Sequence, residues 1–139
     1  MLEKDLYPIV AEYFRKKGYI VFVDDYRFFS YFGRRPDILA VDMHREEIIV
    51  VEVKIRPRIS LKQLYRYMLM SDYTYLAIPF SMPLSDEMIK AMQWGVGIMR
   101  VHDDRVVITK EARRNEPLNI LKDAVLYRVR MMTRSLAEK

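Results

Sequence analysis

The stretch that decides the fold is PDILAV at positions 36–41 together with IIVVEVK at positions 48–54. In the second segment Ile49, Val51 and Val53 would lie on one face of a strand, and Ile48 and Val50 on the other. Both faces are thus apolar, which predicts a strand that is buried on both sides. One of these faces ends in Glu52 and Lys54, two residues apart and therefore pointing the same way. The first segment is a second predicted strand, and Asp37 stands at its start.

Charged groups at the end of a buried strand are costly to remove from water unless they pair with each other or meet a metal ion. The residues between the two strands, Met43 to Glu46, are polar and of hairpin length, so Asp37 and Glu52 are expected at the same end of the sheet. Two carboxylates and a lysine there suit a magnesium site that faces a phosphodiester. The alternative is a plain ion pair that ends an ordinary core strand.

Pro36-Asp37 followed by Glu52-Val53-Lys54 resembles the signature of the PD-(D/E)xK nuclease superfamily, which has the restriction-endonuclease-like fold. The resemblance implies an α/β protein with a central mixed sheet flanked by helices, built on an αβββαβ core. It covers about residues 3–78 and extends to Val101, and the C-terminal helix lies outside it. The implied function is a magnesium-dependent DNA endonuclease, most similar to the small archaeal-type Holliday-junction resolvases, which act as homodimers.

The same resemblance implies roles at the metal centre. Asp37, Glu52 and the backbone carbonyl of Val53 would hold Mg²⁺, with Mn²⁺ able to substitute for it. Lys54 would orient or help to deprotonate the attacking water, or neutralise charge on the phosphate; its alternative is a salt bridge to Glu52 or Asp37. Members of the family often add a glutamate from the first helix, for which this chain offers Glu3 or, as the alternative, Glu12.

Further residues of the predicted site follow on the next helix and before the first motif strand. Gln63 and Tyr67 share a helix face and match a Gln-x-x-x-Tyr pattern of the recombination nucleases, where it contacts the active site or the DNA backbone. Cations expected to contact nucleic acid are Arg34, Arg35, Lys62 and Arg66. Each of these has the alternative of an ordinary solvated surface residue.

Hydrophobic periodicity and capping residues predict the other elements. We expect helices through residues 6–14, 61–70, 85–94 and about 118–136, and strands at 19–23, 36–41, 48–54, 73–78 and 97–101, followed by a turn into residues 106–108. The aromatic stretch 26–32 either stacks on unpaired bases or covers the core or a subunit contact. All 139 residues are expected to form one domain, with its core at about residues 3–101.

Bulk composition limits the function classes without choosing one. Lys and Arg number 24 against 19 for Asp and Glu, a formal charge of +5 that is compatible with nucleic acid. The chain has no cysteine, which excludes disulfides and thiolate chemistry. No apolar run is long enough to suggest a membrane span, so a cytoplasmic protein is expected. DNA is the expected partner and RNA is not excluded; a non-cleaving nucleic-acid or protein binding module is the competing class.

Overall fold

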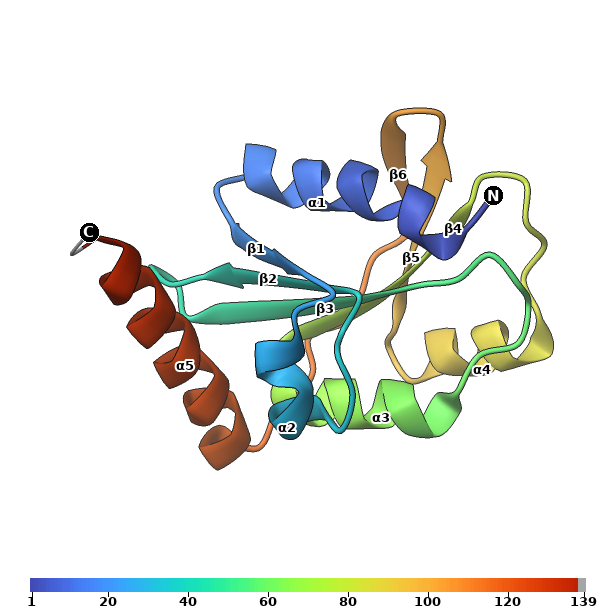
Figure 1. Ribbon diagram of the computed structural model, residues 1–139. Coiled ribbons are helices and arrows are strands. Elements are labelled where there is room, and N and C mark those ends of the chain that lie inside the picture. Colours follow the sequence, from blue (N-terminus) through green and yellow to red (C-terminus); the bar gives the residue numbers. More distant parts are fainter. Residues whose placement is uncertain (138–139) are drawn as a thin grey trace.

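The computed structural model describes residues 1–137 and has a six-stranded mixed sheet between two layers of helices (Figure 1). The strands are β1 (Ile20–Val23), β2 (Ile38–Asp42), β3 (Glu47–Val53), β4 (Tyr73–Pro79), β5 (Gly97–His102) and β6 (Arg105–Lys110). The helices are α1 (Tyr7–Lys16), α2 (Phe29–Phe32), α3 (Leu61–Met70), α4 (Asp86–Gln93) and α5 (Asn119–Ala137), with 3-10 turns at Glu3–Asp5 and Tyr26–Phe28. The expected α/β class, mixed sheet and long C-terminal helix are confirmed.

Strand order in the sheet follows chain order from β1 to β6. The strands β1, β2 and β3 pair antiparallel, β4 and β5 each join in parallel, and β6 closes the edge antiparallel to β5. The parallel connections run through α3 and α4, as parallel pairing requires a crossover. The central strand β3 is buried along its whole length, which agrees with its apolar sequence on both faces.

Two hydrophobic clusters lie on the two faces of the sheet. The first helix α1 covers one face, where its residues Val10 and Phe14 belong to the same hydrophobic cluster as Ile49 and Val51 of β3. On the other face, α2, α3, α4 and α5 pack over the alternate residues of the same strands (Figure 1). Because side chains of a strand alternate between faces, β3 contributes residues to both clusters.

Local signals in the sequence explain where the helices that border the site begin. Pro8 lies in the first turn of α1, where its missing N–H costs no hydrogen bond and its fixed φ suits a helix. Ser60 is the N-cap of α3, and its hydroxyl accepts a hydrogen bond of 3.1 Å from the Gln63 N–H. The start of α3 is the one expected from the sequence, with Ser60 as its cap; for Pro8 the sequence left open a place in the first turn or a kink, and the structure has the first.

The structure departs from the expected order in two places. Residues 105–110 form a full sixth strand, so the sheet is one strand wider than the five strands that periodicity predicted. The aromatic stretch folds into a 3-10 turn and the short helix α2, with Phe28 and Phe32 in the core and Tyr26 and Phe29 exposed. The stretch therefore serves at least partly as core packing.

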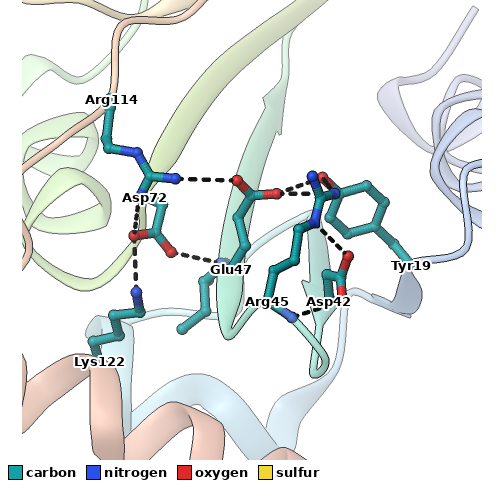
Figure 2. Close-up of polar contacts among 8 residues, drawn as sticks. Tyr19, Asp42, Arg45, Glu47, Asp72, Arg114 and Lys122 are labelled. Carbon is teal, nitrogen blue, oxygen red and sulfur yellow. Dashed lines mark hydrogen bonds and ion pairs between the residues drawn. The ribbon is translucent and has the colours of Figure 1, made fainter.

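The C-terminal segment is tied to the amino-terminal ends of β3 and β4 by a polar network (Figure 2). Asp72 is 1% exposed and accepts from Lys122 Nζ at 2.9 Å, from Arg114 at 3.3 Å and from the Ile48 N–H at 2.8 Å. Glu47, also buried, accepts from the Tyr19 hydroxyl at 2.6 Å and pairs with Arg114 and Arg45, each at 3.4 Å. Each buried carboxylate in this network thus has cationic partners.

Two further observations concern the chain as a whole. Within the part that the structure describes, no helix is both long enough and apolar enough to cross a membrane. Of the single domain expected over residues 1–139, residues 138 and 139 lie outside the described residues.

Candidate metal centre

The two motif carboxylates meet at the end of the sheet opposite the Glu47 network. The antiparallel register pairs Ile38 of β2 with Val51 of β3, so the next positions outward along the two strands are Asp37 and Glu52. The Val53 N–H donates a hydrogen bond of 2.8 Å to Asp37 Oδ2, which fixes the Asp37 side chain against the end of β3. The structure therefore brings Asp37 and Glu52 together, with Val53 beside them.

Asp37 is held at both of its oxygens. Besides the bond from Val53, Oδ1 accepts a hydrogen bond of 2.7 Å from the Tyr7 hydroxyl on α1. Burial raises the pKa of the Asp37 carboxyl above its ordinary value, and the hydrogen bonds from Val53 and Tyr7 oppose this rise because they favour the charged form.

Glu52 is more deeply buried, with 6% of its surface exposed. Burial and, next, the charge of Asp37 raise the pKa of the Glu52 carboxyl to about 8, while Tyr67, Arg34 and Lys54 act in the opposite direction. The Oε2 atom of Glu52 and the hydroxyl of Tyr67 are both fully buried and neither has a hydrogen-bond partner at good geometry. Tyr67 is thus near enough to favour the charge of Glu52 without forming a well-aligned bond to it. Unsatisfied buried polar atoms are uncommon and call for an explanation.

Lys54 follows the last residue of β3, and its backbone N–H donates to the Ala77 carbonyl of β4 at 2.9 Å. Its side chain lines a narrow pocket together with Glu52, Arg34 and Gln63. No ion pair joins Lys54 to either carboxylate in the described part of the chain. The structure thus places Lys54 in the same pocket as Glu52 but without an ion pair to it.

Residues of α3 divide between the pocket and the core. Gln63 is buried and donates a weak hydrogen bond of 3.4 Å from Nε2 to the Phe32 carbonyl. Tyr67 is wholly buried, with its ring edge-on to Phe32 at 5.8 Å. Of the two contacts expected for Tyr67, its buried position next to Glu52 favours the active site over the DNA backbone.

The two glutamates considered as a third metal ligand, Glu3 and Glu12, differ in exposure and in their effect on Asp37. Glu3 is half-buried in the 3-10 turn before α1, and its charge contributes to the raised pKa of Asp37. Glu12 is exposed on α1 and is not among the main causes of the raised pKa of Asp37 or of Glu52. Among residues 1–137, no cluster of three or more histidine, aspartate or glutamate side chains is close enough to hold a metal ion, so neither glutamate joins Asp37 and Glu52 as a third ligand here.

The four cationic residues expected to contact nucleic acid have different surroundings in the structure. Arg34 lines the pocket and acts on Glu52, whereas Arg35 pairs with Asp24 at 3.2 Å. Lys62 is exposed on α3. Arg66 lies against Gly33, whose φ of +76° is left-handed and whose added Cβ would come within 2.8 Å of the Arg66 Nη1 atom.

Sequence reasoning missed three residues near this site. Tyr7 is the first, and the signal for it is its place in the first helical turn, one turn after Glu3. The others are Arg56 and Arg58, exposed in the loop that follows Lys54, which extend a basic run already visible as Lys54-x-Arg56-x-Arg58.

The donor set fits a hard divalent cation. Carboxylate and carbonyl oxygens are the ligands that Mg²⁺ and Mn²⁺ prefer, and Mg²⁺ commonly binds through only one or two carboxylates with water in its other positions. The buried, unpartnered Oε2 of Glu52 is the observation that supports this fit, because a bound cation would satisfy it. Larger hollows of the surface lie elsewhere, under α1 and beside Trp94, and have no pair of neighbouring buried carboxyls.

Comparison with known proteins adds support for the fold. No family model and no curated protein matches the chain. A solved structure, a protein of unknown function from Silicibacter pomeroyi, is similar with a TM-score of 0.59 and 17% sequence identity, over 91% of this chain and 83% of that one. At this identity the likeness shows a shared α/β fold and nothing about activity.

Proposed function

We propose that the protein is a metal-dependent endonuclease that hydrolyses phosphodiester bonds in DNA, directed by the structure of the nucleic acid more than by its sequence. One observation carries the proposal: Glu52 is buried, Asp37 beside it is partly buried, and neither carboxyl has an ion-pair partner among the described residues. Their mutual repulsion is unfavourable for stability unless a cation binds between them. The PD-(D/E)xK pattern of the sequence supports the same class of enzyme.

Each residue then has a chemical role. Asp37, Glu52 and the Val53 carbonyl would hold Mg²⁺ or Mn²⁺. When bound, the metal would polarise the scissile phosphate and lower the pKa of a bound water. Lys54, whose backbone N–H is bonded to the Ala77 carbonyl, lines the same narrow pocket as Glu52. It would orient the water or stabilise charge that develops on the phosphate oxygens.

Exposed cations around the pocket would hold the nucleic acid itself. Arg34 lies at the pocket, and Arg56, Arg58 and Lys62 are exposed on the loop and helix that border it. Backbone phosphates are their natural ligands, and such contacts carry no sequence information. The same metal chemistry would act on RNA, which remains the alternative substrate. A binding module without cleavage is the alternative class.

The test is a cleavage panel with the purified protein and Mg²⁺ or Mn²⁺. The substrates are labelled junctions, flaps, single strands and duplexes of DNA, with matching RNA strands. We expect metal-dependent cutting of at least one DNA substrate, abolished by chelator and by Glu52→Gln. The matched control is Glu46→Gln, which makes the same change on an exposed residue at the other end of β3 and should leave cleavage unchanged.

Two outcomes would contradict the proposal. Binding of DNA without any cleavage of the panel would favour the binding module. Cleavage that persists in Glu52→Gln would mean that the activity comes from elsewhere. The homodimer implied by the resemblance and the cytoplasmic location are parts of the same proposal; light scattering with and without DNA tests the first.

A further inference from the structure

The tyrosine that holds Asp37 is the feature of the site that the sequence motif does not contain. The Tyr7 hydroxyl donates to Asp37 Oδ1 at 2.7 Å, across 30 residues of chain and between two different layers of the fold. The second oxygen, Oδ2, is taken by the Val53 N–H at 2.8 Å. The carboxylate of Asp37 is therefore fixed in orientation by one contact from α1 and one from β3.

The fold keeps Tyr7 in this position. It is the first residue of α1, and Pro8 directly after it restricts the backbone of the first turn. Val10 and Phe14, on the following turns of α1, pack on the sheet and hold the helix at a fixed height above β2 and β3. The Tyr7 side chain is itself partly buried beneath this packing, and its hydroxyl donates to Asp37 Oδ1.

We propose that Tyr7 is a positioning residue of the metal centre: its hydroxyl holds Asp37 in the orientation in which the carboxylate binds the metal ion. This inference rests on the proposed function, because it assumes that Asp37 is a metal ligand. In this inference α1 contributes a hydrogen bond from Tyr7 to the metal ligand Asp37. The sequence had predicted a different contribution, a third metal-binding carboxylate from Glu3 or Glu12.

The chemistry of carboxylates allows both contacts at once. A carboxylate oxygen has two lone pairs, so Oδ1 accepts from Tyr7 and keeps a second pair for a cation. Hydrogen bonds from outside the ligand set orient metal ligands, and their loss typically weakens metal binding by 10- to 100-fold. Removing the Tyr7 hydroxyl frees the Asp37 side chain to rotate about the remaining bond to Val53.

The molecule contains a matched control for this contact. At the other end of the sheet the Tyr19 hydroxyl donates to Glu47 Oε2 at 2.6 Å, a bond of the same kind to a buried carboxylate. Glu47 is already paired with Arg114 and Arg45. If the Tyr7–Asp37 bond has a purely structural role, Tyr7→Phe and Tyr19→Phe should therefore have similar effects on thermal unfolding and on Mn²⁺ affinity.

The experiment measures Mn²⁺ affinity by isothermal titration for wild type, Tyr7→Phe and Tyr19→Phe, with thermal unfolding of each in chelator. We expect Tyr7→Phe to weaken Mn²⁺ binding about tenfold and to remain folded, while Tyr19→Phe keeps the wild-type affinity. Cleavage by Tyr7→Phe should recover at raised Mn²⁺ concentration, because the ligands themselves are intact.

The results separate this inference from the function on which it rests. If the wild type binds Mn²⁺ and Tyr7→Phe binds it equally well or more tightly, the positioning role alone is overturned. An equal loss of affinity in both tyrosine variants also overturns it, since that would be a general effect of destabilisation. So would a Tyr7→Phe variant that is unfolded at 25 °C. A wild-type protein that binds no Mn²⁺ overturns both the inference and the proposed metal site.

Discussion

Both ends of strand β3 carry buried carboxylates, but the two ends differ in whether protein cations pair with these carboxylates. At its amino-terminal end Glu47, together with Asp72 of the neighbouring connection, is buried and paired with Arg114, Arg45 and Lys122 (Figure 2). At its carboxyl-terminal end Glu52 and Asp37 are packed together, and Glu52 Oε2 has no partner. Buried carboxylates are stable when protein cations compensate them. The carboxylates at the first end are thus compensated by protein cations, whereas the second end, under the proposed function, would be compensated by a bound metal ion.

The largest expected effect is on cleavage, at the unpaired end. Lys54→Ala should lower the single-turnover rate by about 100- to 1,000-fold, because an interaction formed mainly in the transition state affects the chemical step. DNA affinity, measured by fluorescence anisotropy in chelator, should change little, since one cation among several is lost. Lys90→Ala, an exposed lysine on α4, is the control. Equal cleavage rates for Lys54→Ala and wild type would remove Lys54 from the mechanism.

The next effect is on stability, at the paired end. Asp72→Asn should lower the free energy of unfolding by about 3 kcal/mol, because it leaves Lys122 and Arg114 without their buried carboxylate. Asp37→Asn, the same change at the other end, should alter stability by less than about 1 kcal/mol in the absence of metal. Urea denaturation in chelator measures both. Equal losses in the two variants would mean that the two ends do not differ in the way described.

A smaller and opposite effect is expected at Glu52. Its pKa of about 8 lies above the ordinary value of 4.5, so the ionised carboxyl destabilises the fold increasingly as the pH rises from 4.5 to 8. Glu52→Gln should therefore stabilise the metal-free protein by about 2 kcal/mol at pH 8 and by almost nothing at pH 4.5. Added Mn²⁺ should stabilise the wild type and have no effect on the variant. A variant less stable than wild type at pH 8 would mark Glu52 as a structural residue.

The smallest effect distinguishes two neighbouring arginines. Arg34 lies at the pocket, while Arg35 is paired with Asp24. Arg34→Ala should weaken DNA binding several-fold for all sequences and reduce the slope of log affinity against log salt by about one. Arg35→Ala should have a weaker effect on both. Anisotropy titrations at several salt concentrations test this, and a larger effect of Arg35→Ala would reverse the assignment.

Patterns among neighbouring residues in the sequence were sufficient to predict most of the helices and strands. The alternation of apolar residues predicted β2 and β3, and helical spacing with Ser60 as a cap predicted α3, because both signals depend on neighbours in the chain. The strand β6 was incompletely predicted because its burial is shallow, which leaves little apolar pattern to detect. The helix α2 is four residues long, too short for a periodic signal.

The site was predictable only where it is local to the two strands. Register places Asp37 beside Glu52, and both carboxylates were expected there. The contact from Tyr7 depends on how α1 packs over the sheet, and the pairing of Arg35 with Asp24 depends on the path of a loop. The sequence shows only that Tyr7 lies in the first helical turn, one turn after Glu3, and it gives no signal for the pairing of Arg35. The same reason explains why the buried position of Tyr67 was missed, since α3 exposes one face and buries another.

The network at the Glu47 end also bears on how the chain folds. Arg114 reaches Glu47 across 67 residues, and Lys122 reaches Asp72 across 50, separations that are slow to close in an unfolded chain. These contacts need β3 and β4 already side by side, so docking of α5 is expected to be the last step of folding. High salt screens the ion pairs and should slow that step, while the collapse of the apolar sheet should proceed at its usual rate.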